Sequence, residues 1–444
     1  MSDLTSRVDA ALDATYDDYK AFINIPSVSS QPEHFEDVGR TAETLAGWLR
    51  DLGAAEVKVV REGGQPAVLA HFPAPEGKPT VCLYAHHDVQ PTGNLDEWTT
   101  PPFEAVERDG RLYGRGAADD KAGVMSHLAM LRAFDGKPPV GVKLFIEGEE
   151  ECGSVSLVNV IERHREMLEA DMFLIGDGGV WEVGTPALNT SLRGVVSAVF
   201  TISTLDHGVH SGEYGGVVPD ALTALVRLLA SLHDDDGSVA IKGLVSGPGP
   251  EVDYPLDRLA DEAGKLPGTQ WIGYGPVTDR MWTQPACATL AIDTTRVADA
   301  SNTLIPSATA KVSVRIAPGD DGKRALKCLM DHIVEHAPWG AKIEFGELDS
   351  GDPCTVASDG PSNTLYRAAL DEAFGSATVE MGTGGSIPMI ADFQQAFPGI
   401  EVAVTGVCDP TSRMHSTDES ASIADWRKYT HATALFLEKL AARG

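Results

Sequence analysis

The sequence predicts an α/β protein whose mostly parallel sheet, covered by helices on both faces, is interrupted by a smaller α+β domain. Short apolar runs alternate with helical segments up to about residue 180, a long β-rich run begins at Leu188, and the first pattern resumes near Asp352. At 444 residues the chain also exceeds the size at which single cores stop growing. We therefore expect a main domain in two parts, residues 1–187 and 354–444, and an inserted domain at residues 188–353.

The first part opens with two amphipathic helices. Apolar residues recur at helical spacing over Leu4–Ile23, which Pro26 ends, and again at about Phe35–Leu52, where Gly53 is placed to cap the end. Apolar runs that follow predict strands, and two further helices lie between them. The strands are expected at 56–60, 67–71, 80–85, 142–146 and 171–175, and the helices after Asp119 and at 155–165.

The inserted segment has a different texture. We expect strand, helix, two strands, helix and strand on one antiparallel sheet: strands at 188–204, 286–292, 307–317 and 341–347, and helices at 219–232 and 323–335. The last part returns to helices at 362–374, 387–397 and 423–442, a strand at 401–404 and a loop at 406–418.

Charge and cysteine usage exclude several classes of protein. Against 35 Lys and Arg the chain has 65 Asp and Glu, a formal net charge of -30, which repels nucleic acid and anionic membranes, so neither is an expected partner. No apolar run is long enough to span a bilayer. The N-terminus lacks the apolar core of a signal peptide, and no two of the six cysteines have CxxC spacing. These features predict a cytoplasmic protein.

Polar side chains capable of binding metal follow the predicted strands. His86 and Asp88 come directly after the strand at 81–85, where alternate residues point to the same side; an ordinary surface loop is the alternative. Asp119 and Asp120 begin a helix, where acidic residues also serve as simple caps, but Asp119 has two oxygens with which to bridge two cations.

Three adjacent carboxylates follow the strand at 142–146. Glu149, Glu150 and Glu151 repel one another there unless cations compensate, although charge runs are most often only solvated. Asp177 ends a further strand, and His415 is a late imidazole. Imidazole with carboxylate and without thiol suits Zn, Mn or Co. Two such ions with a bridging water would polarise a carbonyl and supply a nucleophile, so the pattern predicts a hydrolase.

The same residues carry a resemblance to a known family. The sequence resembles the M20 metallopeptidases, in the dipeptidase branch that includes carnosinase and cytosolic non-specific dipeptidase. The matching motifs, in order, are residues 84–91, 114–121, 147–154, 192–194, 210–212, 305–306, 384–388 and 415–416.

The resemblance implies which residue does what. One metal would be held by His86, Asp119 and Asp177, and the other by Asp119, Glu151 and His415. Glu150 would be the general base, and Asp88 would orient His86. The inserted domain would be a lid and dimerisation surface, from which His210 would reach the oxyanion of the partner subunit's site while Arg315 and Thr303 would hold the substrate carboxylate. Gly385 and Ser386 would line the same pocket. The family also implies a non-proline cis peptide between Asp119 and Asp120.

We therefore expect a hydrolase that uses two divalent ions, most simply Zn, to cleave dipeptides or short peptides with a free carboxylate, through a metal-bridging water activated by Glu150. The expected assembly is a homodimer. One alternative is an N-acyl amino-acid deacylase or desuccinylase of the same family. A more distant alternative is a non-catalytic binding protein on the same fold, which should have lost a ligand or Glu150, and none is missing.

Overall fold

The computed structural model describes residues 3–384 and 388–443. The chain forms two compact units: unit 1 comprises residues 1–190, 356–381 and 392–444, and unit 2 comprises residues 191–355 and 382–391. Each is described here by itself. The expected boundaries at 187/188 and 353/354 stay a prediction, and residues 382–391, expected in the main domain, group with unit 2.

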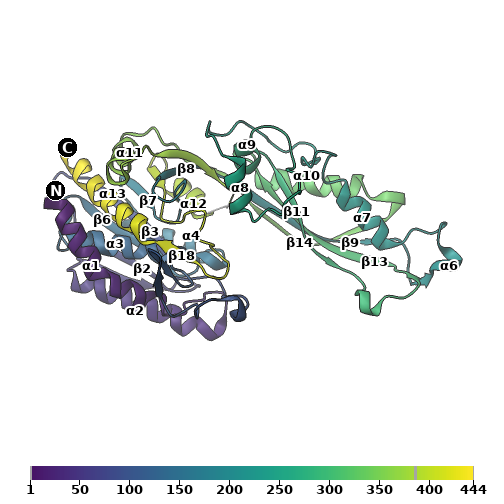
Figure 1. The fold of residues 1–444 in the computed structure, drawn as a ribbon, viewed down its shortest axis with the longest axis horizontal. Coiled ribbons are helices and arrows are strands. Elements are labelled where there is room, and N and C mark those ends of the chain that lie inside the picture. Colours follow the sequence, from purple (N-terminus) through teal and green to yellow (C-terminus); the bar gives the residue numbers. More distant parts are fainter. Residues whose placement is uncertain (1–2, 385–387, 444) are drawn as a thin grey trace. The chain divides into compact units, whose positions relative to one another are not determined.

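Unit 1 is built on a six-stranded sheet (Figure 1). Its strands, in spatial order, are β1 (Glu56–Val60), β2 (Ala67–Phe72), β6 (Gly141–Glu147), β3 (Thr80–His86), β7 (Met172–Ile175) and β17 (Glu401–Val404). The pairs β6/β3, β3/β7 and β7/β17 are parallel, whereas β1/β2 and β2/β6 are antiparallel. The mostly parallel sheet that the sequence predicts is therefore confirmed.

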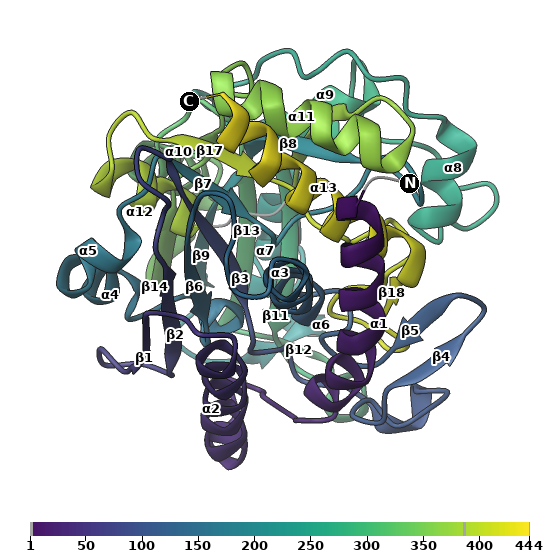
Figure 2. The same cartoon turned by 90° about the vertical axis from the view of Figure 1, so that its left-hand side faces the viewer.

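Helices cover both faces of this sheet, as Figure 2 shows for α1 and α3 on one side and α4 and α5 on the other. One layer contains α1 (Asp3–Ile23), α2 (Phe35–Asp51), α3 (Lys121–Ala133), α11 (Pro361–Phe374) and α13 (Ile423–Ala442). The other contains α4 (Leu157–Arg163), α5 (Arg165–Leu168) and α12 (Pro388–Ala396). Alternate strand residues serve the two layers: Leu83 and Leu144 belong to the large core, whereas Phe173 contacts Phe393 of α12, with ring centroids 4.3 Å apart. Continuous burial of β3 and β7 follows from this sandwich.

Unit 2 contains a four-stranded antiparallel sheet. Its strands, in spatial order, are β11 (Ala286–Asp293), β13 (Ser307–Ile316), β9 (Gly194–Ser203) and β14 (Lys342–Gly351). On β9 the burial alternates strictly, because Val196, Ala198 and Phe200 face the core beneath α7 (Ala221–Ala230) and α10 (Gly322–Glu335). A short pair, β10 (Val209–His210) and β12 (Thr303–Leu304), lies outside the main sheet.

Smaller elements complete the described structure. The run that we expected as one strand at 188–204 is two, β8 (Ala187–Leu192) and β9, and Arg193 separates them. The division arises because β8 pairs with β15 (Cys354–Thr355) and β16 (Val379–Thr383), whereas β9 pairs with β13 and β14. The remaining elements include β4 (Val106–Arg108), β5 (Arg111–Tyr113), β18 (Ser420–Ser422), α6 (Ser211–Tyr214), α8 (Leu256–Glu262) and α9 (Val277–Trp282). All six cysteines are free thiols, and within the described chain no helix is long and apolar enough to cross a membrane.

Candidate metal centre

The predicted metal-binding residues of unit 1 gather where three neighbouring strands end. β6, β3 and β7 lie side by side and run in parallel, so their carboxyl ends meet at one edge of the sheet. His86 is the last residue of β3, and Glu150 and Glu151 follow β6, while Asp177 follows β7. Asp119 precedes α3 at the same edge. The polar residues that follow separate buried runs in the sequence are thus brought into one cluster by the fold.

His86 is the centre of a first group of ligand atoms. Its Nε2 lies 3.0 Å from Asp119 Oδ1 and 3.8 Å from Asp177 Oδ1. Ligand atoms of His86, Glu150 and Asp177 all lie within 4.8 Å of one another. The other ring nitrogen, Nδ1, lies 3.0 Å from the backbone carbonyl oxygen of Asp88. When Nδ1–H donates to this oxygen, Nε2 is left free to bind a cation.

His415 forms a second group on the other side of Asp119. Its Nε2 lies 3.0 Å from Asp119 Oδ2 and 3.2 Å from Glu151 Oε2. His415 has a φ of 59°, in the left-handed region, which turns its side chain within the loop between β17 and β18. The two oxygens of Asp119 therefore face two different imidazoles. The predicted cis peptide between Asp119 and Asp120 is confirmed.

The charges of this cluster fit divalent cations. Burial and the neighbouring carboxylates raise the pKa of Asp177 well above its ordinary value, and the same two causes raise that of Glu151. Burial also acts to raise the pKa of Asp119, but its contacts with His415 and His86 outweigh that effect and lower it. So many carboxylates in one buried place repel one another unless positive charge compensates. Imidazole and carboxylate without thiolate is a donor set that suits such an ion.

Asp88 has a broader structural role than the one expected. Its carboxylate Oδ1 lies 3.4 Å from His86 Nδ1, whereas the backbone carbonyl oxygen of Asp88 lies 3.0 Å from the same nitrogen. The carboxylate instead accepts hydrogen bonds from the backbone N–H groups of Glu150, at 3.2 Å, and Glu151, at 3.1 Å. These are the first amides of the short 3₁₀ helix Glu150–Cys152. Asp88 thus joins the end of β3 to the segment that carries both glutamates.

Two further residues of the site have no role in the sequence-based account. Gln90 Nε2 donates to Glu151 Oε2 at 2.8 Å and so orients that carboxylate. The buried carboxylate of Glu419 accepts hydrogen bonds from the backbone N–H groups of Gly116, Ala118 and Asp119. Gln90 could have been found from its position two residues after Asp88. No local pattern identifies Glu419.

The residues expected to contact substrate lie in unit 2. β10 and β12 place His210 directly opposite Thr303, and His210 is exposed. Arg315 is on β13, between Ala286 of β11 and Val195 of β9. Gly385 and Ser386 lie outside the described residues.

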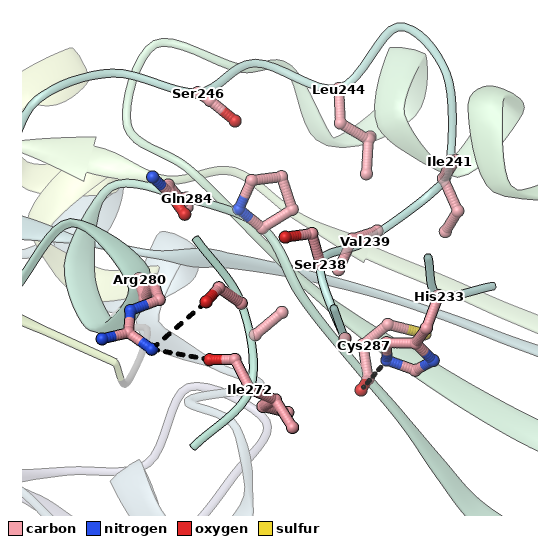
Figure 3. Close-up of a pocket in the computed structure, with 14 residues that line it drawn as sticks. His233, Ser238, Val239, Ile241, Leu244, Ser246, Ile272, Arg280, Gln284 and Cys287 are labelled. Atoms are coloured by element: carbon pink, nitrogen blue, oxygen red, sulfur yellow. Dashed lines mark hydrogen bonds between the residues drawn. The ribbon is translucent and has the colours of Figure 1, made fainter. Parts of the chain in front are cut away.

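Unit 2 also contains a cavity of about 200 Å³ (Figure 3). Two of its polar side chains contact backbone carbonyl oxygens: Arg280 donates to that of Ile272 at 2.7 Å, and His233 Nε2 lies 3.2 Å from that of Cys287. None of the predicted site residues that the structure describes lines this cavity. It is therefore separate from the site that the sequence predicts.

Comparison with known proteins agrees with this geometry. Residues 82–439 match the model of Peptidase family M20/M25/M40. The cysteinylglycine-S-conjugate dipeptidase of Corynebacterium striatum is 35% identical over 418 residues, which are 93% of this chain and 92% of that protein. The Beta-Ala-His dipeptidase of Rattus norvegicus is 27% identical, over 84% of this chain and 81% of that protein. The crystal structure of human carnosine dipeptidase 1 has a TM-score of 0.84 at 25% identity and covers 99% of this chain and 98% of its own.

The family match covers most of the chain and includes every predicted metal-binding residue, and the structure brings these residues together around Asp119. The relatives are named as dipeptidases, so the deacylase alternative is not favoured. The chain belongs to peptidase family M20 and is a metal-dependent peptidase.

Proposed function

We propose that the enzyme is a dipeptidase that hydrolyses the amide bond of dipeptides or short peptides with a free carboxylate. The observation that carries the proposal is the position of Asp119, whose two oxygens each lie 3.0 Å from a different imidazole, His86 and His415. The names of the relatives, which are dipeptidases for cysteinylglycine conjugates and for Beta-Ala-His, support the substrate class.

In this proposal His86, Asp119 and Asp177 would hold one divalent ion, and Asp119, Glu151 and His415 would hold the other. Zn, Mn and Co all accept imidazole and carboxylate ligands. We favour Zn, with Mn and Co as alternatives. Such a pair of ions polarises a carbonyl and lowers the pKa of water. The protein supplies the fixed spacing of the ligands. Gln90 orients the carboxylate of Glu151 by donating a hydrogen bond to it, and Asp88 accepts a hydrogen bond from the Glu151 backbone N–H.

Glu150 is proposed as the general base. Its pKa is raised to about 7, with burial as the largest cause; the nearby His86 opposes the rise, and the carboxylates of Glu151 and Asp119 add to it. A carboxyl group with a pKa near the working pH exchanges protons efficiently. Its carboxylate would take a proton from the attacking water and deliver it to the nitrogen of the leaving amine. Asp88 would position this side chain through the Glu150 N–H.

Unit 2 would supply the groups that hold the substrate. We assign His210 to the developing oxyanion, and Arg315, Thr303, Gly385 and Ser386 to the substrate. Arg315 suits a carboxylate because guanidinium can donate two parallel hydrogen bonds to it. We further propose a homodimer in which His210 acts on the partner's site, and a cytoplasmic location, which six free thiols favour.

The substrate class is tested by incubating the purified enzyme, loaded with Zn, Mn or Co, with free and N-acylated dipeptides. Release of free amino acids from unblocked dipeptides, abolished by chelation, is the expected result. Turnover of N-acyl amino acids alone would establish the deacylase alternative, and no turnover of either class would support a binding protein.

The base is tested with Glu150→Gln, which keeps the size of the side chain. We expect the variant to bind two equivalents of metal and to lose turnover by at least about 100-fold, the lower end of general acid–base contributions. Glu162→Gln, on the exposed surface of α4, is the matched control and should behave as wild type. Near-normal turnover in Glu150→Gln would remove Glu150 from this role.

A further inference from the structure

The cavity of unit 2 has a polar side and an apolar side (Figure 3). Arg280 and Gln284 line one side of it, and Ile241 and Leu244 line the opposite side. Ile241 is 4% exposed and belongs to the apolar core of the unit, and Leu244 packs against that core. The cavity therefore presents a charged group at one end and aliphatic carbon at the other.

Arg280 is a cation whose only partners in the described structure are backbone carbonyl groups. Its Nη1 donates to the carbonyl oxygen of Ile272 at 2.7 Å, and its Nε donates to that of Pro276 at 3.4 Å. No carboxylate in the described part of the chain forms a salt bridge with Arg280, and its Nη2 makes no hydrogen bond there. Carbonyl oxygens orient a guanidinium without neutralising it, so this charge is available to an anion.

The other titratable groups of the cavity add no negative charge to it. Within the described residues no acidic side chain lines it. Burial raises the pKa of the Cys287 thiol to about 12, so the thiol is neutral at pH 7. The carboxylate of Asp236, just before the lining segment, is exposed and accepts the N–H of Ser238 at 2.9 Å. A cationic ligand in this cavity would be repelled by Arg280 and would find no counter-charge.

The volume of about 200 Å³ sets the size of the ligand. Because a cavity of ~150 Å³ holds a benzene molecule, this one holds roughly eight non-hydrogen atoms. Ile272 lines the cavity and is also 67% exposed, so a ligand can enter beside it. The segment at this entrance is fixed on both sides, because Gly273 N–H donates to the carbonyl oxygen of Asp236 at 2.7 Å and Arg280 contacts the carbonyl oxygens of Ile272 and Gly273. A preformed site of this kind loses little conformational freedom on binding.

We propose that this cavity is a second small-molecule site of the enzyme, which binds a short aliphatic monocarboxylate of the size of hexanoate. The carboxylate binds Nη2 of Arg280 and the side-chain amide of Gln284, and the aliphatic chain lies against Ile241 and Leu244. An amide or an amine of the same chain is rejected because neither compensates the guanidinium. The inference goes beyond the proposed function and does not rest on it, since none of the described residues assigned to the metal ions or the substrate lines the cavity.

The position of the ligand is tested by photolabelling the wild-type holoenzyme with a diazirine analogue of pentanoic acid. Peptide mass spectrometry reports which residues react. We expect labelling within residues 237–246 and 272–287, and its suppression by sodium hexanoate. A carboxylate can also bind a metal ion, so peptides that carry the proposed metal ligands are scored separately. The absence of labelling in these two segments, or labelling there that hexanoate does not suppress, overturns the proposal.

The chemistry of the ligand is tested by competition for this labelling in wild type. Hexanoate should bind at least about 10-fold more tightly than hexanamide, the lower end of the range for hydrogen bonds to a charged group, and hexylamine should not compete. Butanoate should bind roughly 10-fold more weakly than hexanoate, because it buries a shorter aliphatic chain. Equal binding of hexanoate and hexanamide, or of hexanoate and butanoate, overturns the assigned ligand class.

The role of Arg280 is tested with Arg280→Gln, which removes the charge. Its preference for hexanoate over hexanamide should fall to within about twofold. Arg227→Gln is the matched control, because Arg227 is an exposed arginine of α7 that does not line the cavity, and it should keep the wild-type preference. An unchanged preference in Arg280→Gln overturns the assignment of Arg280. If Arg280→Gln does not fold, the labelling and competition measured on wild type decide the proposal.

Discussion

Glu419 accepts a hydrogen bond from the backbone N–H of Asp119 at 3.1 Å, across three hundred positions of sequence. The same carboxylate accepts the N–H groups of Gly116 and Ala118 and forms a salt bridge with the buried Arg115 at 2.5 Å. Glu419 also follows His415 by four residues. Glu419 therefore connects the backbone of one proposed metal ligand, Asp119, to the loop that carries another, His415, and in the proposed centre these two residues would hold the same cation.

We expect Glu419→Gln to weaken metal binding roughly 10- to 100-fold, the range seen when groups that position metal ligands are removed. The NH₂ group of glutamine would face backbone N–H groups that need an acceptor, and the neutral side chain would leave Arg115 without its counter-charge. The measurement is the metal dissociation constant by competition with a chelator, so it does not depend on turnover.

Glu401→Gln is the matched control for this prediction. Glu401 also accepts backbone N–H groups, from Ser362 and Asn363 at the start of α11, but it begins β17 at the opposite end of the sheet from the metal centre. It should lower thermal stability without changing metal affinity. Equal losses of affinity in the two variants would mean that Glu419 contributes only to global stability.

Asp88→Asn tests the connection between β3 and the glutamate segment. Asparagine can accept the N–H of Glu150 or of Glu151 but turns a donor toward the other. We expect kcat to fall roughly 10- to 100-fold, and the free energy of unfolding to fall by about 1–3 kcal/mol because a buried donor loses its partner. Steady-state kinetics and urea denaturation measure the two quantities.

The control for Asp88→Asn is Asp371→Asn. Asp371 accepts the N–H and the hydroxyl of Thr378 within unit 1, far from the predicted ligands in sequence. Both hydrogen bonds are accepted by one oxygen, Oδ1, which asparagine retains, so this variant should keep both its stability and its kcat. A normal kcat in Asp88→Asn would show that Glu150 and Glu151 are positioned without it.

Three of the five proposed metal ligands, His86, Glu151 and Asp177, could be predicted because each ends or follows a buried run, whereas the roles of Asp119 and His415 came from the resemblance. β3 is buried up to its last residue, His86, while Glu151 follows the end of β6 by four residues and Asp177 follows the end of β7 by two. Parallel strands bring such ends to one edge, so local patterns sufficed to place these three residues together. The sheet of unit 2 was predictable for a similar reason, since β9 alternates buried and partly exposed residues.

Other features depend on contacts that no local pattern encodes. Glu419 lies in a polar loop, and its role appears only when Gly116 and Ala118 fold against it. The division of the 188–204 run at Arg193 depends on which partner strands are available. The short helices α8 and α9 lie in a segment rich in Gly and Pro, where periodicity is too brief to detect.

Metal binding should release protons at neutral pH. Hydrogen bonds to Asp119 and Glu151 raise the pKa of His415 to about 10 in the metal-free protein, so its imidazole is charged at pH 7. A metal ligand must be neutral imidazole, and binding therefore displaces that proton. Calorimetric titration of Zn into metal-free enzyme, in buffers of different ionisation enthalpy, should give a release of at least one proton at pH 7. A pH-independent release below one would contradict the assignment of His415.

The metal-free protein should lose stability as the pH rises from about 5 to 8, and Glu147 is one cause. This residue is 2% exposed, and burial raises its pKa to about 8, although the hydrogen bond donated by Tyr84 at 2.8 Å opposes the shift. Between the ordinary pKa of a glutamate and about 8, the folded state holds a proton that the unfolded state has released. Deprotonation therefore favours unfolding, by at most about 1.4 kcal/mol per pH unit.

Glu147→Gln, which is neutral at every pH, should flatten this part of the stability curve, measured by urea denaturation at pH 5.5 and 8 after chelation. Glu104→Gln, on the exposed surface, should leave the slope as in wild type. An unchanged slope in Glu147→Gln would mean that Glu147 is already ionised in the folded protein, with Tyr84 compensating the buried charge.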